Sequence, residues 1–160
     1  MMLETRYDSP VGPLTLVSDG RVLLALHFAP SAYETENDPA LTAARCWLDA
    51  YFAGNAPSPR TLPLAPASTP FQKSVREILL DIPRGKFMTY GEVARLAARR
   101  LGKARMSAQA VGNAVGANPF PIIVPCHRIL ASGGRLGGFS SGLEIKRRLL
   151  DLEHIPVVLR

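Results

Sequence analysis

A proline-rich stretch limits how this chain can fold, because it interrupts regular secondary structure before the middle of the sequence. Residues 54–68 read GNAPSPRTLPLAPAS and show little hydrophobic periodicity. Proline fixes φ and removes a backbone donor, so neither a helix nor a central strand continues through such a segment. We therefore predict a linker at 54–68, which closes an N-terminal domain, residues 1–68, and precedes a C-terminal domain, residues 69–160.

The segment before the linker predicts a small α/β domain. Leu14 and Leu16 alternate with polar or smaller residues, and a second apolar run at 22–26 follows Asp19-Gly20, a pair typical of hairpin turns. Apolar residues then recur at helical spacing over 40–53. We expect an antiparallel sheet with one helix, in which Cys46 is an inert core residue and His27 is a packed strand side chain rather than a metal ligand.

The segment after the linker predicts four helices. Thr69-Pro70 is a helix start, and Pro83-Arg84-Gly85 ends that helix. Helices at about 90–101 and 107–116, joined by a short turn, match helix-turn-helix geometry. A last helix is expected from Ser141, with Ser141 and Glu144 as a capping box, to about Leu152. We expect Leu96 and Leu101 in the first helix of the pair, and Ala108 in the second, to be buried with the neighbouring valines.

Charge is distributed unevenly between the two halves. Residues 1–80 hold 6 Lys/Arg and 8 Asp/Glu, whereas residues 81–160 hold 13 and 5. A basic C-terminal half is typical of a surface that meets a polyanion, although a solvated basic surface gives the same count. The second helix of the pair also presents small or uncharged residues outward, namely Gln109, Ala110, Gly112, Asn113 and Gly116. Because glycine costs a helix about 1 kcal/mol relative to alanine, we expect either tight helix packing or close approach to a ligand such as DNA in its minor groove.

The chemistry concentrates in one apolar, rigid segment. Residues 118–128 read NPFPIIVPCHR, which delivers Cys126 beside His127 and Arg128. Nearby cations lower the pKa of a thiol, and the thiolate is the nucleophile, so we predict that Cys126 is reactive. Two cysteines without a second Cys or His at ligand spacing predict no metal site and no disulfide framework. They also favour a reducing, cytoplasmic location.

Overall composition is that of an ordinary globular protein. The 160 residues are 47% hydrophobic and 20% charged, and no apolar run approaches the ~20 residues that a membrane helix requires. The N-terminal residues lack a cationic segment followed by an apolar one, so we expect neither a secretory signal nor a membrane partner.

The segment NPFPIIVPCHRIL resembles the signature of the O6-alkylguanine-DNA alkyltransferases, also called methylated-DNA–protein-cysteine methyltransferases. The resemblance extends along nearly the whole chain. It includes GPLTLVSDGRVLLALHF, CWLDAYFAGN, TPFQKSVREILLDIPRGKFMTYGEVA, AVGNAVGANP and GGFSSGLEIKRRLLDLE. It implies an N-terminal α/β domain of ribonuclease H-like fold and a mostly α-helical, winged helix-turn-helix-like C-terminal domain.

The resemblance also implies a role for each matching residue. Cys126 would accept the alkyl group, His127 would act as the base through a bridging water, and Glu153 would orient His127. Asn118 would hold the active-site turn, and Tyr90 would help to rotate the nucleotide and donate a hydrogen bond to the leaving guanine. The partner would be double-stranded DNA carrying O6-alkylguanine, with O4-alkylthymine as a second candidate substrate. The protein would act once, as a monomer, without a cofactor.

Candidate DNA contacts are implied on the helix pair and beside the cysteine. They are Gln109, Ala110, Gly112, Asn113, Arg105, Ser140 and Arg128, although Arg128 more commonly joins the active-site turn to the helices. Backbone near Val124 and Cys126 would contact the base.

Two departures from the family pattern bear on DNA binding. Gln109 replaces the arginine that usually fills the gap left by the flipped base, and the turn RRLGKARMS is longer than usual. Arg105 is then a candidate for phosphate contact or for the wedge. Phe139 stands where many members have tyrosine.

Three other functions compete with alkyl transfer. A lesion sensor would lack the acceptor cysteine, which is present here. A cysteine hydrolase would use Cys126, His127 and Glu153 on a small ester and would turn over. A helix-turn-helix regulator would use Cys126 only to sense alkylation.

Overall fold

A computed structural model describes residues 1–138 and 142–158 of the chain. The chain divides into two compact units. The first comprises residues 1–65 and 119–123, and the second comprises 66–118 and 124–160. Residues 119–123 join the first unit because the backbone of β3 pairs with them: the Leu26 N–H donates to Pro119 O at 2.8 Å. Phe139, Ser140 and Ser141, which carried expectations, lie outside the described residues.

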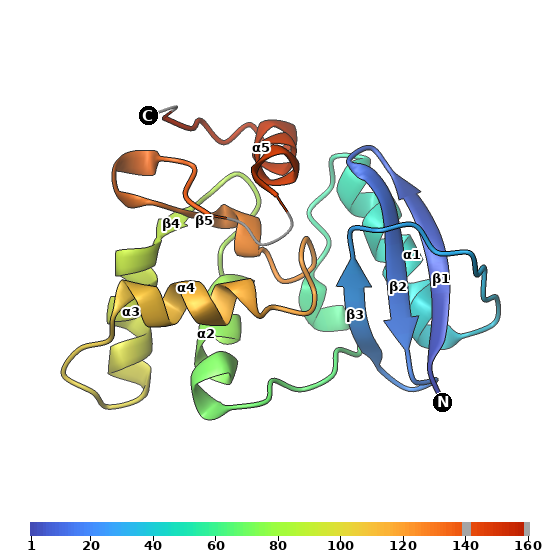
Figure 1. Ribbon diagram of the computed structural model, residues 1–160, viewed down its shortest axis with the longest axis horizontal. Helices are drawn as coiled ribbons and strands as arrows, with labels where there is room; N and C mark the ends of the chain where they lie inside the picture. Colours follow the sequence, from blue (N-terminus) through green and yellow to red (C-terminus); the bar gives the residue numbers. More distant parts are fainter. Residues whose placement is uncertain (139–141, 159–160) are drawn as a thin grey trace. The chain divides into compact units, whose positions relative to one another are not determined.

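The first unit is built on a three-stranded antiparallel sheet in the order β1-β2-β3 (Figure 1). The strands are β1, Leu3–Ser9; β2, Gly12–Ser18; and β3, Leu23–His27. Asp19-Gly20 forms the turn between β2 and β3, as predicted. The Asp19 carboxylate accepts the N–H groups of Arg21 and Val22, and Gly20 has a φ of +92°, which glycine adopts without strain.

One helix, α1 (Pro39–Phe52), lies against a face of this sheet (Figure 1). Asp38 caps it by accepting the N–H of Leu41 at 3.0 Å, and Pro39 occupies its first turn. The helix buries its apolar stripe: Ala40, Leu41, Ala44, Trp47, Leu48 and Tyr51. A short 3-10 turn, η1 (Pro59–Thr61), follows in the proline-rich stretch.

Two expectations for this unit are wrong. Cys46 is exposed, because position 46 lies on α1 away from the stripe formed by Ala44 and Leu48. His27 is also exposed, at the last position of β3. Neither residue is part of the core.

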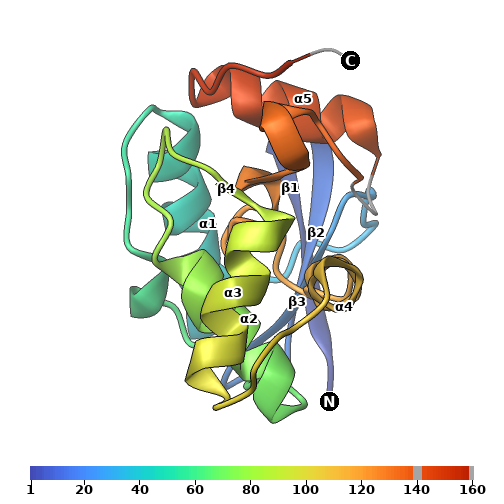
Figure 2. The same cartoon turned by 90° about the vertical axis from the view of Figure 1, so that its left-hand side faces the viewer.

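The second unit begins with a capped helix and a helix pair. Thr69 caps α2 (Pro70–Leu80), accepting the N–H of Gln72 at 3.0 Å. Thr89 and Glu92 form a capping box on α3 (Tyr90–Arg100), and Ser107 caps α4 (Ala108–Gly116). Figure 2 shows α4 end-on with α3 beside it, and α2, α3 and α4 pack on one another. This is the helix-turn-helix arrangement expected from the sequence.

The apolar face of the pair is shifted slightly from the prediction. Ala94 and Ala98 are buried in α3, whereas Leu96 and Leu101 are only partly buried. In α4 Val111 and Val115 are buried, but Ala108 is exposed, because it is the first residue of the helix.

The remaining elements surround the cysteine segment. They are β4, Met88–Thr89; η2, Cys126–Arg128; β5, Ile129–Leu130; η3, Ser132–Gly134; and α5, Leu143–Leu152. Strands β4 and β5 pair in parallel. Helix α5 ends at the predicted residue, and Gly142 occupies the position before its first residue. Ser141, on which the expected capping box depends, lies outside the described residues. No helix within the described residues is long and apolar enough to cross a bilayer.

Candidate active site

Cys126 begins a single 3-10 turn, η2, directly after Pro125. The side chain is 4% exposed, and His127 and Arg128 in the same turn are also buried. This turn places three functional groups of consecutive residues inside the second unit.

Glu153 links the turn to the end of α5. Its Oε2 lies 2.6 Å from His127 Nε2, and its two oxygens accept Arg128 Nε at 2.8 Å and Nη2 at 3.1 Å. The Gly85 N–H donates to Oε1 at 3.2 Å. Arg128 Nη1 donates to Ile82 O at 2.7 Å. The bidentate guanidinium contact fixes the carboxylate in orientation as well as in charge.

Charge in this buried cluster is concentrated on Glu153 and Arg128. Burial alone would raise the pKa of Glu153, but the hydrogen bonds and charges of His127 and Arg128 outweigh it and hold that pKa well below its usual range. Burial lowers the pKa of His127, against the opposing effect of Glu153. We therefore assign an ionised Glu153 and a neutral His127 at pH 7.

This charge state determines the tautomer of His127. An ionised carboxylate only accepts hydrogen bonds, so Nε2 carries the proton and donates it to Glu153. The lone pair is then on Nδ1, a buried atom with no hydrogen-bond partner among the described residues. His127 is thus a neutral base whose second nitrogen is already oriented by a carboxylate, the arrangement that base catalysis requires.

The thiol itself differs from the prediction. Burial raises the pKa of Cys126 to about 11, and this effect exceeds the lowering by Asn118, by Lys146 and by backbone N–H groups. The expectation of a lowered thiol pKa is wrong, because burial outweighs the lowering by the nearby cation Lys146, and Arg128 is committed to Glu153. Cys126 is therefore a thiol in the resting protein, and its proton must be removed for reaction.

Asn118 holds the segment that leads to the cysteine. Its Nδ2 donates to Val124 O at 3.0 Å, and its side chain also hydrogen-bonds Cys126. One amide therefore fixes the backbone before the turn and contacts the reactive residue.

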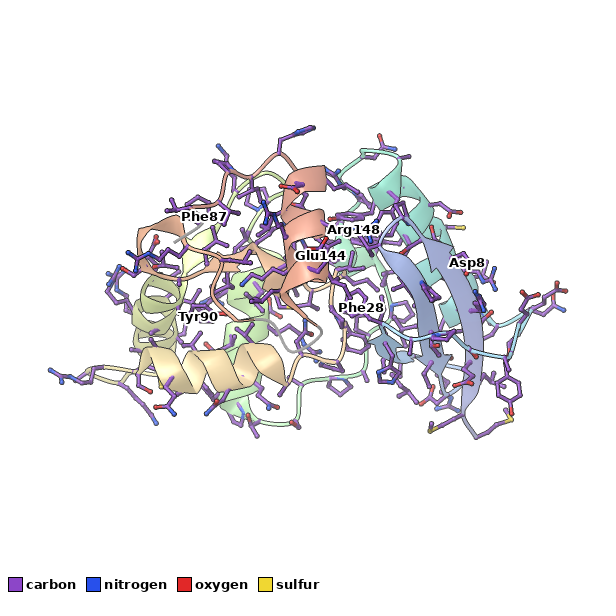
Figure 3. The ribbon with its side chains drawn as sticks, turned by 45° about the horizontal axis from the view of Figure 1, so that its top comes forward. Asp8, Phe28, Phe87, Tyr90, Glu144 and Arg148 are labelled. Atoms are coloured by element: carbon purple, nitrogen blue, oxygen red, sulfur yellow. The ribbon has the colours of Figure 1, made fainter. Side chains whose placement is uncertain are left out.

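Tyr90, the first residue of α3, lies beside α4 (Figure 3). Its hydroxyl donates to Gly138 O at 3.3 Å. Burial raises the pKa of Tyr90, and the nearby Cys126 adds to this effect. The phenol therefore remains protonated at neutral pH and can donate a hydrogen bond.

Lys146 is a site residue that the sequence analysis missed. The residue is fully buried on α5, its Nζ donates to Gly138 O at 3.0 Å, and it lies 5.8 Å from the centroid of the Tyr90 ring. Burial lowers its pKa to about 8. A signal was present: Lys146 precedes Leu149 and Leu150 by three and four residues, so it shares their buried face.

An apolar pocket of about 680 Å³ lies in front of Tyr90. Its walls come from the start of α3, from α4 and from the loop after β5. Lining residues include Tyr90, Gln109, Gly112, Gly116, Ala131 and Gly138. A hollow of this size accommodates a planar ligand of nucleobase size.

The glycines of α4 are not required by packing inside the protein. A Cβ on Gly112 would lie 3.9 Å from the Tyr90 ring, an ordinary contact, and one on Gly116 would meet nothing within 4 Å. Of the two explanations left open by the sequence, close approach of an external ligand is therefore favoured over tight helix packing.

The other candidate DNA contacts divide into two groups. Gln109 and Asn113 are exposed on α4, Ala110 and Gly112 are partly buried there, and Arg105 is exposed in the α3–α4 connection. Arg128, in contrast, is buried and bonded to Glu153 and Ile82, so it is not available to DNA. Ser140 and Phe139 lie outside the described residues. Within those residues no group of three or more His, Cys, Asp or Glu side chains is placed to share a metal ion.

Two family models match the chain. Residues 2–66 match the ribonuclease-like domain of 6-O-methylguanine DNA methyltransferase, and residues 70–155 match the DNA binding domain of the same family.

Named relatives match over most of their length. The methylated-DNA–protein-cysteine methyltransferase of Haemophilus influenzae is 38% identical, covering 96% of this chain and 87% of the relative. That of Methanosarcina acetivorans is 41% identical, covering 92% and 95%.

Solved structures agree with these matches. The O6-methylguanine methyltransferase of Mycobacterium tuberculosis superposes with a TM-score of 0.78 at 39% identity, covering 96% of this chain and 93% of that one. The structure of the Mycobacterium tuberculosis protein in complex with DNA gives 0.77 at 40% identity, covering 94% and 92%.

Proposed function

Since this chain belongs to the 6-O-methylguanine DNA methyltransferase family, we propose that Cys126 is the residue to which it transfers alkyl groups from DNA. The protein is a methylated-DNA–protein-cysteine methyltransferase that acts in DNA repair. The observation that carries the assignment is the juxtaposition of a buried thiol with the His127–Glu153–Arg128 cluster. The other cysteine, Cys46, is exposed on α1.

The proposed reaction begins with removal of the thiol proton. His127 Nδ1 takes it through a bridging water, and the imidazolium that forms is stabilised by Glu153, whose charge is already held by Arg128. The thiolate sulfur then attacks the alkyl carbon. The new S–C bond forms as the C–O6 bond breaks, and the electron pair of that bond goes to the guanine.

The leaving base must also be stabilised. The Tyr90 hydroxyl, protonated at neutral pH, donates a hydrogen bond to the guanine as negative charge develops on it. Guanine leaves after gaining one proton, which balances the proton lost by the thiol. A thioether has no route back to the thiol, so each molecule acts once, and no cofactor takes part.

The proposed substrate is O6-alkylguanine in duplex DNA, with O4-alkylthymine as a second candidate. The O6-alkyl group lies within the duplex, so the nucleotide must be rotated out, at a cost of a few kcal/mol. The apolar pocket in front of Tyr90 would receive the base, and the small residues of α4 would enter the minor groove. Gln109 would fill the gap in the duplex.

We further infer that the protein acts as a monomer in a reducing compartment such as the cytoplasm. The proposed acceptor is a single thiol that must remain unoxidised to react, and such compartments maintain free thiols. One cysteine, one base and one pocket all lie in the second unit of one chain.

Two cysteine variants test the assignment. Cys126→Ala should abolish transfer from a duplex carrying O6-methylguanine while its affinity for that duplex stays close to the wild type. Cys46→Ala is the matched control and should transfer at the wild-type rate. Loss of transfer in Cys46→Ala, or full transfer in Cys126→Ala, would show that the acceptor has been misassigned.

A further inference from the structure

A second hollow, of about 430 Å³, lies along the outer side of α3 and the α3–α4 connection. Four cationic side chains line it: Arg95 and Arg99 from α3, and Lys103 and Arg105 from the connection. All four residues are exposed. We call this hollow, defined by these four residues, the basic cleft.

The cations of the basic cleft are not neutralised by the protein. No acidic residue lines the cleft, and no ion pair joins any of the four to a carboxylate within residues 1–138 and 142–158. Arg100, the neighbour of Arg99 on the same helix, differs: its Nη2 lies 3.6 Å from Asp81 Oδ2. The cleft therefore concentrates positive charge that is available to an external anion.

The basic cleft adjoins the apolar pocket. Gly91 and Ala108 line both hollows, so the two are separated only by the start of α3 and the start of α4. A ligand that extends from the apolar pocket over Ala108 reaches the cations. The residues that line the apolar pocket carry no charge, since Gln109 is neutral.

We propose that the basic cleft binds backbone phosphates of the DNA strand next to the nucleotide held in the apolar pocket. The proposal rests on the proposed function and adds to it an anchor for the strand. Arginine forks bind phosphate oxygens in a bidentate manner, and such contacts orient DNA without reading its sequence. The long α3–α4 connection supplies two of the four charges, so the extra residues of this turn would contribute to phosphate binding.

The salt dependence of DNA affinity tests the proposal. The double variant Arg95→Gln/Arg99→Gln and the double variant Lys103→Gln/Arg105→Gln are compared with the wild type on an undamaged duplex. Each lost phosphate contact should reduce the slope of log affinity against log salt concentration by about 0.9. The ratio of wild-type affinity to variant affinity should therefore fall by about threefold per lost contact between 50 and 200 mM salt. Arg100→Gln removes the same charge from the same helix and should keep the wild-type slope.

Transfer from a free O6-alkylguanine base, which presents no phosphate, separates this proposal from the proposed function. All variants should alkylate Cys126 from the free base at the wild-type rate, which also shows that they are folded. Slopes equal to that of Arg100→Gln, with transfer intact, would overturn the basic cleft alone. Absence of transfer to Cys126 in the wild type would overturn the proposed function, whatever the slopes.

Discussion

At the scale of single residues, the site combines a buried thiol with a carboxylate that cannot easily be protonated. Cys126 has a pKa raised to about 11 by burial, so little thiolate exists at pH 7 until His127 removes the proton. The nearby ammonium of Lys146 lowers the thiol pKa, but by less than burial raises it. Reactivity is therefore conditional on the base.

The thiol pKa predicts how Cys126 reacts with a simple electrophile in the absence of DNA. In a Cys46→Ala background, the rate of alkylation by iodoacetamide should still rise by about tenfold per pH unit near pH 9, because the thiolate fraction rises in that ratio below the pKa. Lys146→Met should react more slowly below pH 8, where Lys146 is charged and favours the thiolate, and the difference should narrow above its pKa of about 8. A plateau in the wild type below pH 8 would contradict a raised pKa.

Glu153 should contribute to stability as well as to the site. Glu153→Gln leaves the buried Arg128 without its counter-charge, so the free energy of unfolding should fall by about 3–5 kcal/mol at pH 7. Because the pKa of Glu153 is depressed in the folded protein, its contribution is full above the unfolded value near 4.5 and is lost as pH falls below it. Urea unfolding at pH 7 and pH 4 should show the gap between wild type and variant narrowing by about 1 kcal/mol, with the rest lost only as pH falls further, through the depressed pKa of Glu153 in the folded protein.

Glu144→Gln, on an exposed residue of the same helix, is the control for that experiment. Its unfolding free energy should stay close to the wild type at both pH values. A Glu153→Gln protein as stable as Glu144→Gln would contradict the buried cluster described here.

At the scale of elements, local rules in the sequence predict most helices well. Thr69 and Ser107 mark helix starts at the residues where the structure has them, and Asp19-Gly20 marks the hairpin. Burial was harder to predict: Cys46, His27 and Ala108 are exposed because helix phase and position at an element end decide exposure, not residue type.

The composition of the active site was also only partly predictable from the sequence. The sequence places Cys126 beside His127, but Glu153 and Lys146 come from α5, and no spacing rule brings that helix to the turn. Glu153 was expected only through the family resemblance. Lys146 was not expected, because lysine is almost never fully buried unless it is paired.

The loop after β5 makes a close contact that a glycine substitution should disturb. Gly137 has a φ of +68°, and a Cβ there would lie 3.3 Å from the Tyr90 ring and from Ala131 N. Gly137→Ala should therefore cost about 1–2 kcal/mol in unfolding free energy and displace Tyr90, which slows alkyl transfer. Gly138→Ala is the matched control for stability: a Cβ there meets nothing within 4 Å, so the free energy of unfolding should change little. An unfolding free energy of Gly137→Ala equal to that of Gly138→Ala would contradict the close contact described at Gly137.

At the scale of the whole molecule, the chemistry and the basic charge belong to the same unit. Cys126, His127, Glu153, Tyr90 and Lys146 all lie in the second unit, as do the four cations of the basic cleft. The first unit, slightly acidic overall, contributes the sheet and α1 but none of these groups. The uneven charge in the sequence therefore follows the division into units, because the reactive groups and the basic cleft lie together in the second unit.

Intact-mass spectrometry tests the central claim most directly. The protein is mixed with a duplex that carries a single O6-methylguanine, and its mass is compared with that after mixing with undamaged DNA. The account predicts the gain of one methyl group per molecule, mapped to the peptide that holds Cys126, and no further gain with excess damaged duplex. A protein that binds the lesion but keeps its mass, or that carries the methyl group on another residue, would contradict it.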